Sequence, residues 1–298
     1  MKKDKLPFFG AATALITPMN GDGSIDFDSL GRLIDFQIES GIDALLVLGT
    51  TGEPSTLTEE EKRKILSFTR DRINGRVPLI VGTGTNDTKK TADFSRYAAL
   101  NGADAVLVVT PYYNKTTDEG LILHYKTVAE SCDCPVILYN VPTRTGMNIS
   151  LQVYKELSGV ENIVGVKEAS GNIGKVSEII SECGDNLTVW SGNDSETVPV
   201  MALGGAGVFS VLSNIMPREV VELTDLMKSG RYTEAAENAK RLNGITKALF
   251  FEVNPIPVKE ACRMIELTKT AVCRPPLCEI VDKNRLALEN ELKKINLI

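Results

Sequence analysis

The sequence predicts an α/β fold, namely a (β/α)8 (TIM) barrel with a C-terminal helical appendage. Eight short apolar runs alternate with amphipathic segments, at a period of about 20 to 35 residues, which indicates a parallel sheet with crossover helices. Eight is also the number of strands that closes such a barrel. The chain of 298 residues is long enough for one large core, and barrels of this type routinely run to about 250 residues.

The candidate strands are apolar and β-branched without polar alternation, so we expect them to be buried on both faces. In chain order they are residues 11–17, 44–48, 79–82, 105–109, 136–139, 163–167, 187–191 and 207–211. An open, doubly wound sheet is the structural alternative. It would be expected to carry a glycine-rich dinucleotide turn after the first strand, and residues 17–21 (Thr-Pro-Met-Asn-Gly) are not such a turn.

Helix signals lie between these runs. Thr58 and Glu61 have the spacing of a capping box, which opens a predicted helix that reaches Gly75. Ser150 is placed to cap a later helix. These signals place helices between the strands, as a barrel requires.

The pattern changes after Gly230, where no further strand is predicted. Three segments beyond it have helical periodicity, namely residues 231–251, 257–267 and 282–295. No Gly/Ser-rich linker separates them from the barrel, so we expect them to pack on it. We therefore predict that residues 1–230 form a barrel that carries the active site and that residues 231–298 form a C-terminal helical region.

Composition argues against several classes of protein. The chain is 43% hydrophobic and 24% charged, with a formal net charge of −6, as expected for a globular protein. Its basic residues are scattered, which argues against nucleic acid or an anionic membrane surface as a partner. No apolar run reaches the roughly 18 residues that a membrane span needs.

The N-terminus superficially resembles a signal peptide, because lysines precede a short apolar stretch. That stretch contains Pro7 and runs into the first predicted strand, so we interpret it as mature protein and expect a cytoplasmic location. The six cysteines are then expected to be reduced. Cys132 and Cys134 are too few to hold a metal, and His124 is the single histidine, so we predict no structural metal.

Lys167 is the most informative residue. It ends the apolar run of residues 163–166 (Ile-Val-Gly-Val), where burial would disfavour the ammonium and lower its pKa toward neutrality. A free amine there can attack a ketone and form a Schiff base. The alternative is a solvated lysine at a strand end.

Reacting groups in a barrel of this type sit at the C-terminal ends of its strands. The predicted strand ends collect residues 49–53, 111–114, 139–146, Lys167 and residues 191–194. An amine, phenols, hydroxyls and a guanidinium would thus face one rim, as Schiff-base chemistry on an oxo acid requires. Taken singly, these residues are equally compatible with a tight turn, aromatic packing and a surface charge, and their joint placement favours the functional interpretation.

Five motifs give the chain a resemblance to a known family. They are residues 49–53 (Gly-Thr-Thr-Gly-Glu), 111–114 (Pro-Tyr-Tyr-Asn), 139–146 (Tyr-Asn-Val-Pro-Thr-Arg-Thr-Gly), 166–170 (Val-Lys-Glu-Ala-Ser) and 254–259 (Asn-Pro-Ile-Pro-Val-Lys). In order and spacing they resemble the 4-hydroxy-tetrahydrodipicolinate (dihydrodipicolinate) synthase family over essentially the whole chain. The wider superfamily, which includes N-acetylneuraminate lyase and sugar-acid aldolases, shares the barrel and the lysine.

The resemblance implies a reaction. Lys167 would condense with pyruvate, and the resulting enamine would attack L-aspartate 4-semialdehyde to give 4-hydroxy-tetrahydrodipicolinate, in lysine and diaminopimelate biosynthesis. By the same resemblance this reaction would need no metal and no organic cofactor. It also implies that Tyr139 donates and accepts protons, with a relay through Thr50 and through Tyr113 of a neighbouring subunit. The family expectation is a homotetramer built from dimers.

Four further positions are carried over from the family. Thr51 would contact the carboxylate of pyruvate, and Gly192 would line the pocket. Phe209 stands at a pyruvate-binding position that is often aliphatic in the family. Arg144 would hold the carboxylate of aspartate semialdehyde, and the sugar-acid lyases lack it as a rule.

The resemblance also locates an inhibitory L-lysine site found in many members. The corresponding residues are Pro54, Ser55, Glu59, Lys62, Asn86, Lys90 and Tyr112. Four of them, including Lys90, depart from the inhibited pattern. Lys90 stands where a carboxylate would receive the amino group of the effector, and like charge there disfavours binding. We therefore predict weak or absent inhibition by lysine.

Two other functions remain as alternatives. One is an aldolase that releases pyruvate from a 2-keto-3-deoxy sugar acid or from N-acetylneuraminate, against which Arg144 and the Thr50-Thr51 pair argue. The other is a non-catalytic pyruvate-binding protein on the same fold, against which Lys167 and Tyr139 argue.

Overall fold

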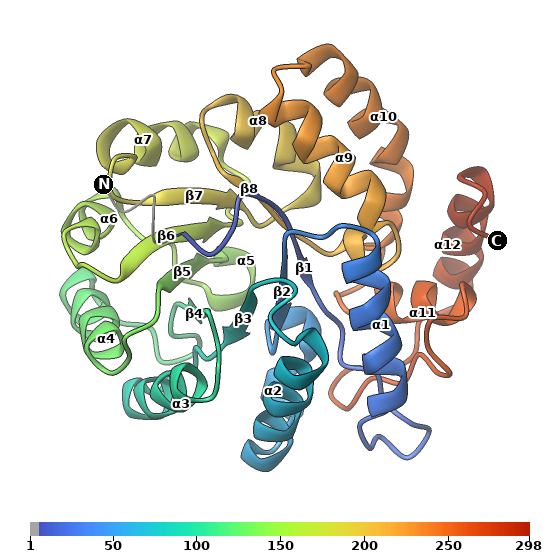
Figure 1. The fold of residues 1–298 in the computed structure, drawn as a ribbon, viewed down its shortest axis with the longest axis horizontal. Coiled ribbons are helices and arrows are strands. Elements are labelled where there is room, and N and C mark those ends of the chain that lie inside the picture. Colours follow the sequence, from blue (N-terminus) through green and yellow to red (C-terminus); the bar gives the residue numbers. More distant parts are fainter. Residues whose placement is uncertain (1–5) are drawn as a thin grey trace.

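A closed barrel of parallel strands forms the centre of the molecule (Figure 1). The computed structural model describes residues 6–298, so the lysines of the signal-like N-terminus lie outside the described residues. Within them the strands are β1 (Gly10–Ala14), β2 (Ala44–Val47), β3 (Leu79–Gly82), β4 (Ala105–Val109), β5 (Val136–Asn140), β6 (Ile163–Glu168), β7 (Thr188–Ser191) and β8 (Gly207–Ser210). They pair in chain order, and β8 pairs with β1. The predicted (β/α)8 barrel is confirmed.

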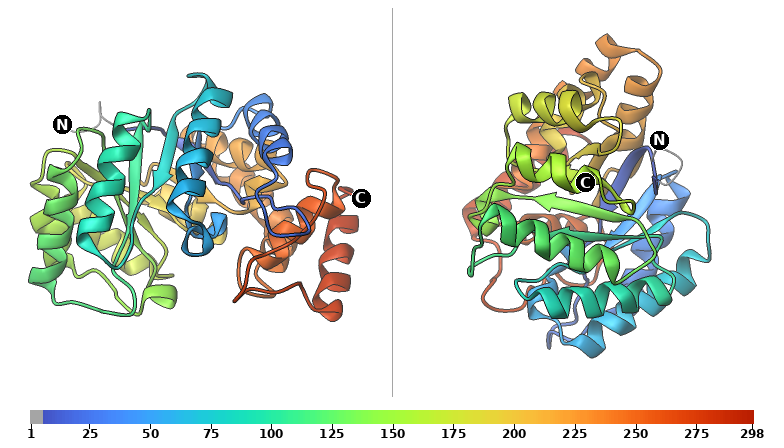
Figure 2. Two further views of the ribbon diagram at one scale, coloured as in Figure 1. Left: turned by 90° about the horizontal axis from the view of Figure 1, so that it is seen from below. Right: turned by 90° about the vertical axis from the view of Figure 1, so that its left-hand side faces the viewer.

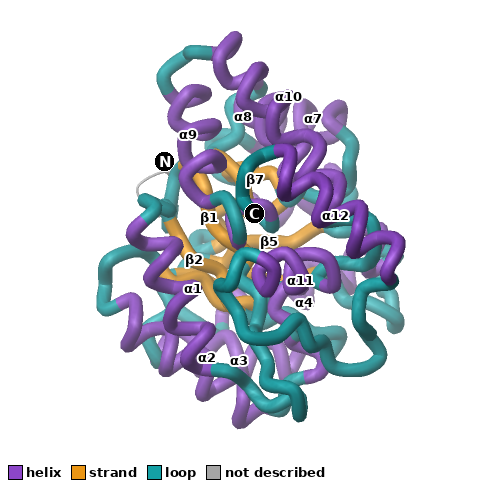
Figure 3. The backbone as a smooth tube through the Cα atoms, turned by 90° about the vertical axis from the view of Figure 1, so that its right-hand side faces the viewer, coloured by secondary structure: helices purple, strands orange, loops and turns teal. Residues whose placement is uncertain are grey.

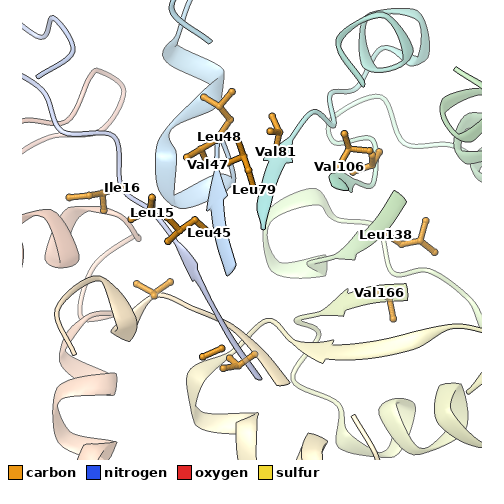
Figure 4. Packing of buried hydrophobic residues seen from close by; sticks show 14 of the residues in the cluster. Leu15, Ile16, Leu45, Val47, Leu48, Leu79, Val81, Val106, Leu138 and Val166 are labelled. Atoms are coloured by element: carbon orange, nitrogen blue, oxygen red, sulfur yellow. The ribbon is translucent and has the colours of Figure 1, made fainter. Parts of the chain in front are cut away.

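The strands are buried on both faces, which explains their apolar composition. Alternate residues enter two different clusters. Leu46 and Ile80 belong to a cluster with Trp190 inside the barrel. Leu45 and Val81 belong to the larger cluster between the sheet and the surrounding helices (Figure 4).

Helices surround the barrel and connect successive strands (Figure 1). They are α1 (Phe27–Glu39), α2 (Glu59–Ile73), α3 (Thr88–Leu100), α4 (Asp118–Glu130), α5 (Pro142–Thr145), α6 (Leu151–Ser158), α7 (Ile173–Cys183), α8 (Thr197–Ala202) and α9 (Pro217–Lys228). The capping box at Thr58 is present, and the hydroxyl of Ser150 accepts from Val153 N at 3.3 Å. The helix after Thr58 ends at Ile73, earlier than predicted, because Asn74 takes a left-handed conformation at φ 48°.

Three further helices follow the barrel, namely α10 (Tyr232–Ala248), α11 (Ile256–Met264) and α12 (Asp282–Lys294). Figures 2 and 3 show α11 and α12 beside the barrel, on the side of α1. Val258 and Leu288, on these last two helices, share the larger apolar cluster with the outer faces of the strands. No helix between residues 6 and 298 combines the length and the apolar character that crossing a membrane takes.

Candidate active site

Lys167 lies inside the barrel at the C-terminal end of β6. Its side chain is almost fully buried, with 4% of the residue surface exposed. Parallel pairing sets Tyr139 on β5 directly beside it, and Nζ lies 4.5 Å from the centre of the Tyr139 ring and 5.3 Å from that of Phe209. The amine thus faces two aromatic rings.

The electrostatics of the site favour a neutral amine. Burial lowers the pKa of Lys167 to about 7, with Arg144 adding to the shift and Asp194 opposing it. Near pH 7 a large fraction of Lys167 is therefore a neutral amine, the form that can act as a nucleophile. Burial raises the pKa of Tyr139, while a hydrogen bond with Thr50 opposes that rise. The phenol accordingly keeps its proton at neutral pH and is available as a donor.

Gly192 and Phe209 both lie against the lysine. A Cβ added at Gly192 would lie 3.2 Å from Cγ of Lys167 and 2.6 Å from Cβ of Ala169, so a side chain there would displace the amine. Phe209 is fully buried, and its ring packs against Phe8 at 5.1 Å. It closes the barrel interior beside Lys167.

Thr51 and Arg144 both form hydrogen bonds with Asn254, a residue that follows the barrel in the sequence. Thr51 lies in the short helix η2 (Thr50–Gly52) after β2, and Asn254 Nδ2 donates to its Oγ1 at 2.9 Å. Arg144 lies in α5, and its Nη2 donates to the carbonyl of Asn254 at 2.9 Å. The C-terminal region therefore contributes to the rim of the barrel.

Tyr113 is the one sequence-predicted site residue that lies apart from the others. It is 94% exposed and has a left-handed φ of 71°, which is uncommon for a bulky residue. The fold of a single chain does not bring it to Lys167. The six others, Thr50, Thr51, Tyr139, Arg144, Gly192 and Phe209, are placed around Lys167 and the rim beside it by the contacts above.

A cavity of about 320 Å³ opens at this rim. It is lined by residues that include Thr50, Tyr139, Arg144 and Asn254. Lys62, Lys90 and Tyr112 from the predicted lysine site line the same cavity. The volume suits a small-molecule substrate.

The predicted strand ends 49–53 and 191–194 include two carboxylates, Glu53 and Asp194, to which sequence reasoning gave no role. Asp194 accepts hydrogen bonds from Val211 N at 2.9 Å and from the hydroxyl of Ser210, which fixes the end of β8; burial raises the pKa of its carboxyl. Glu53, next to η2, pairs with Lys259 at 2.6 Å. The partners of both carboxylates lie in other segments of the sequence, so no local signal shows what the two groups contact.

Between residues 6 and 298, no group of three or more His, Cys, Asp or Glu side chains is arranged to hold a metal ion. The six cysteines all carry free thiols.

Comparison with known proteins identifies the family. Residues 7–295 match the model of the Dihydrodipicolinate synthetase family. The chain belongs to this family. A 4-hydroxy-tetrahydrodipicolinate synthase of Acetivibrio thermocellus is 48% identical over 291 residues, which cover 98% of each chain. One from Clostridium perfringens is 43% identical over 98% of this chain and 99% of the relative.

Solved structures of the family have the same fold. The dihydrodipicolinate synthase of Aquifex aeolicus superposes with a TM-score of 0.95 at 46% identity, covering 97% of this chain and 99% of the other. That of Thermotoga maritima gives 0.96 at 41% identity, covering 98% and 100%. The family resemblance predicted from the five motifs is confirmed.

Proposed function

We propose that the protein is a Schiff-base-forming lyase that condenses pyruvate with L-aspartate 4-semialdehyde, giving 4-hydroxy-tetrahydrodipicolinate and one water. The observation that carries this proposal is a buried Lys167 with a pKa of about 7, set beside Tyr139 in a chain whose relatives bear the name of that synthase. The reaction belongs to lysine and diaminopimelate biosynthesis.

The first half of the reaction takes place on Lys167. Its amine attacks the ketone of pyruvate, water leaves, and a protonated imine remains, which acts as an electron sink. Loss of a methyl proton gives the enamine. Tyr139 and Thr50, already hydrogen-bonded to each other, would carry the protons, and the hydroxyl of Thr51 would hold the carboxylate of pyruvate. Gly192 leaves room for the imine, and Phe209 bounds the pocket.

In the second half the enamine carbon attacks the aldehyde and forms a C–C bond and a hydroxyl group. Arg144 would bind the carboxylate of the aldehyde substrate as a two-pronged donor. The amino group of the adduct then attacks the imine carbon, and Lys167 leaves as a free amine. The ring closes, and no electron carrier is needed.

Several finer points belong to the same proposal. The exposure of Tyr113 supports its donation to the site of a neighbouring subunit, in a homotetramer built from dimers. We place the enzyme in the cytoplasm, with small molecules as its substrates and without nucleic acid or membrane partners. The barrel of residues 1–230 would carry the active site, and residues 231–298 would support its rim.

The test of this function is turnover of pyruvate with L-aspartate 4-semialdehyde, coupled to a reductase that consumes NADPH. Loss of NADPH that depends on both substrates is expected. No loss, with borohydride still trapping pyruvate on Lys167, would overturn the synthase and favour the pyruvate-releasing aldolase. No trapping at all would favour the non-catalytic binding protein.

The pH dependence follows from Lys167. Because its pKa is about 7, we expect kcat/KM for pyruvate to rise about tenfold per pH unit below that value and to level off above about pH 8. A plot of kcat/KM against pH from 5.5 to 9 measures this rise and its plateau. A value of kcat/KM that is still rising tenfold per pH unit at pH 9 would contradict a buried, neutral amine.

Lysine should inhibit the enzyme weakly or not at all. Lys90 lines the cavity and presents positive charge to an incoming ammonium. Glu59, which lines the same cavity, is already paired with Lys62 at 2.8 Å. Titration of L-lysine into the coupled assay measures this. Micromolar inhibition would contradict it, and Lys90→Glu is the variant in which lysine inhibition is expected to strengthen.

A further inference from the structure

Asn254 connects the two residues that we assign to the substrate carboxylates. Its carbonyl accepts from Arg144, and its side-chain Nδ2 donates to Thr51, both at 2.9 Å. With its oxygen accepting from Asn254, the hydroxyl of Thr51 has its proton free for a second group. One residue from outside the barrel therefore holds both carboxylate-binding groups in place.

The remaining polar atom of Asn254 is unused by the protein. The residue is 6% exposed, and its Oδ1 is buried without a hydrogen-bond partner among residues 6–298. The residue lines the same cavity as Tyr139 and Arg144. A buried acceptor without a donor is costly, and one on the wall of a substrate cavity is suited to a ligand that supplies the donor.

We propose that Oδ1 of Asn254 accepts an N–H from the amino group of the aldehyde substrate, so that the site selects a 2-amino-4-oxo acid over its analogue without the amino group. This inference rests on the proposed function. The amino group and the carboxylate of such a substrate share one carbon. A carboxylate bound to Arg144, which is itself held by Asn254, therefore brings the amino group near the same residue.

An amide suits this task better than a carboxylate. A carboxylate at residue 254 would pair with the guanidinium of Arg144 and would stabilise the protonated ammonium. The neutral amide oxygen accepts one N–H and leaves the nitrogen lone pair free to attack the imine carbon. In that attack a C–N bond forms, a proton passes from the substrate nitrogen to the lysine nitrogen, and the bond to Lys167 breaks.

A comparison of two aldehydes distinguishes a direct contact between Asn254 and the substrate amino group from a purely structural role of Asn254. Succinic semialdehyde has the same carboxylate and aldehyde but no amine to release Lys167, so it is measured as an inhibitor at saturating pyruvate. In Asn254→Leu we expect kcat/KM for aspartate semialdehyde to fall by about tenfold or more. The inhibition constant of succinic semialdehyde should change less than about threefold, since that ligand makes no use of Oδ1.

Asn238 on α10 provides a matched control. It is 8% exposed, its Nδ2 donates to Glu222 at 3.0 Å, and its Oδ1 is also buried without a partner among the described residues. It does not line the cavity, so Asn238→Leu should leave both constants unchanged. Asn254→Asp keeps an oxygen acceptor, so aspartate semialdehyde should still bind in preference to succinic semialdehyde, while kcat should fall because the carboxylate holds the ammonium protonated. Retention of this binding preference guards against misfolding as the cause of the losses in the leucine variant.

The outcomes distinguish the two proposals. Equal losses for the two aldehydes in Asn254→Leu, or no loss for either, would overturn the role of Asn254 while turnover by the unaltered enzyme upholds the synthase. Loss of the preference in Asn254→Asp would overturn it as well. No turnover by the unaltered enzyme would overturn both proposals together.

Discussion

Replacing Lys167 by methionine is expected to lower kcat by more than about 10³-fold and, at the same time, to stabilise the fold at pH 7. The activity falls because the nucleophile is lost. The free energy of unfolding rises because a buried ammonium is removed. The pKa of Lys167 is about 7 in the folded protein, against an ordinary value of 10.5.

Between pH 7 and 10.5 the unfolded chain keeps the proton on Lys167 and the folded chain releases it. The unfolded state therefore binds more protons, and the free energy of unfolding rises with pH across this range. The free-energy cost of burying the Lys167 ammonium therefore applies in full below pH 7 and disappears above pH 10.5. Its size is up to about 4 kcal/mol at neutral pH, which the methionine variant would recover in part.

Activity and thermal unfolding of Lys167→Met are measured together at pH 7. Lys64 offers a matched control, because it lies on the surface with 61% of its side chain exposed, paired with Glu60 at 2.7 Å. Lys64→Met should leave kcat unchanged and leave the melting temperature close to that of the unaltered enzyme. Activity of Lys167→Met within tenfold of the unaltered enzyme would refute the assignment of the nucleophile.

Features encoded within short stretches of sequence could be predicted. The two-sided burial of β6 shows in its run of apolar residues, and the low pKa of Lys167 follows from its position at the end of that run. The capping box at Thr58 is a signal within four residues. In each case the physical cause lies next to its effect in the chain.

Features that join distant segments could not be predicted. Asn254 and Thr51 are hydrogen-bonded across 203 positions of sequence, and Lys259 and Glu53 across 206. The resemblance included residues 254–259 as a motif but gave them no role, since nothing next to Lys259 in the sequence shows that it is buried against Glu53.

Breaking the Glu53–Lys259 pair is the second change with a large expected effect. Both side chains are 1% exposed, and Nζ lies 2.6 Å from Oε1. The other carboxylate oxygen accepts from Arg274 N at 3.0 Å. Lys259→Met would leave the carboxylate buried without its counter-charge, at a cost of about 3–5 kcal/mol, which lowers the melting temperature by about 5–15 °C.

Activity should fall as well, because Glu53 directly follows η2, which carries Thr50 and Thr51. Its left-handed backbone, with φ of 55°, is unfavourable for a residue with a side chain, and the contacts of its carboxylate hold it there. When the pair is lost, we expect the loop to shift and kcat/KM for pyruvate to drop about tenfold or more.

The double variant Glu53→Gln, Lys259→Met distinguishes the effect of an unpaired buried charge on stability from the effect of a displaced loop on activity. Removing both charges abolishes the unpaired carboxylate, so at least half of the lost stability should return. Activity should recover less, because the glutamine lacks the ion pair that fixes the loop. Lys126→Met, which breaks a surface pair with Glu156 at 2.8 Å, is the control. If Lys259→Met lowered the melting temperature no further than this control does, the buried Glu53–Lys259 pair would not be what anchors the loop of Thr50, Thr51 and Glu53 to the C-terminal region.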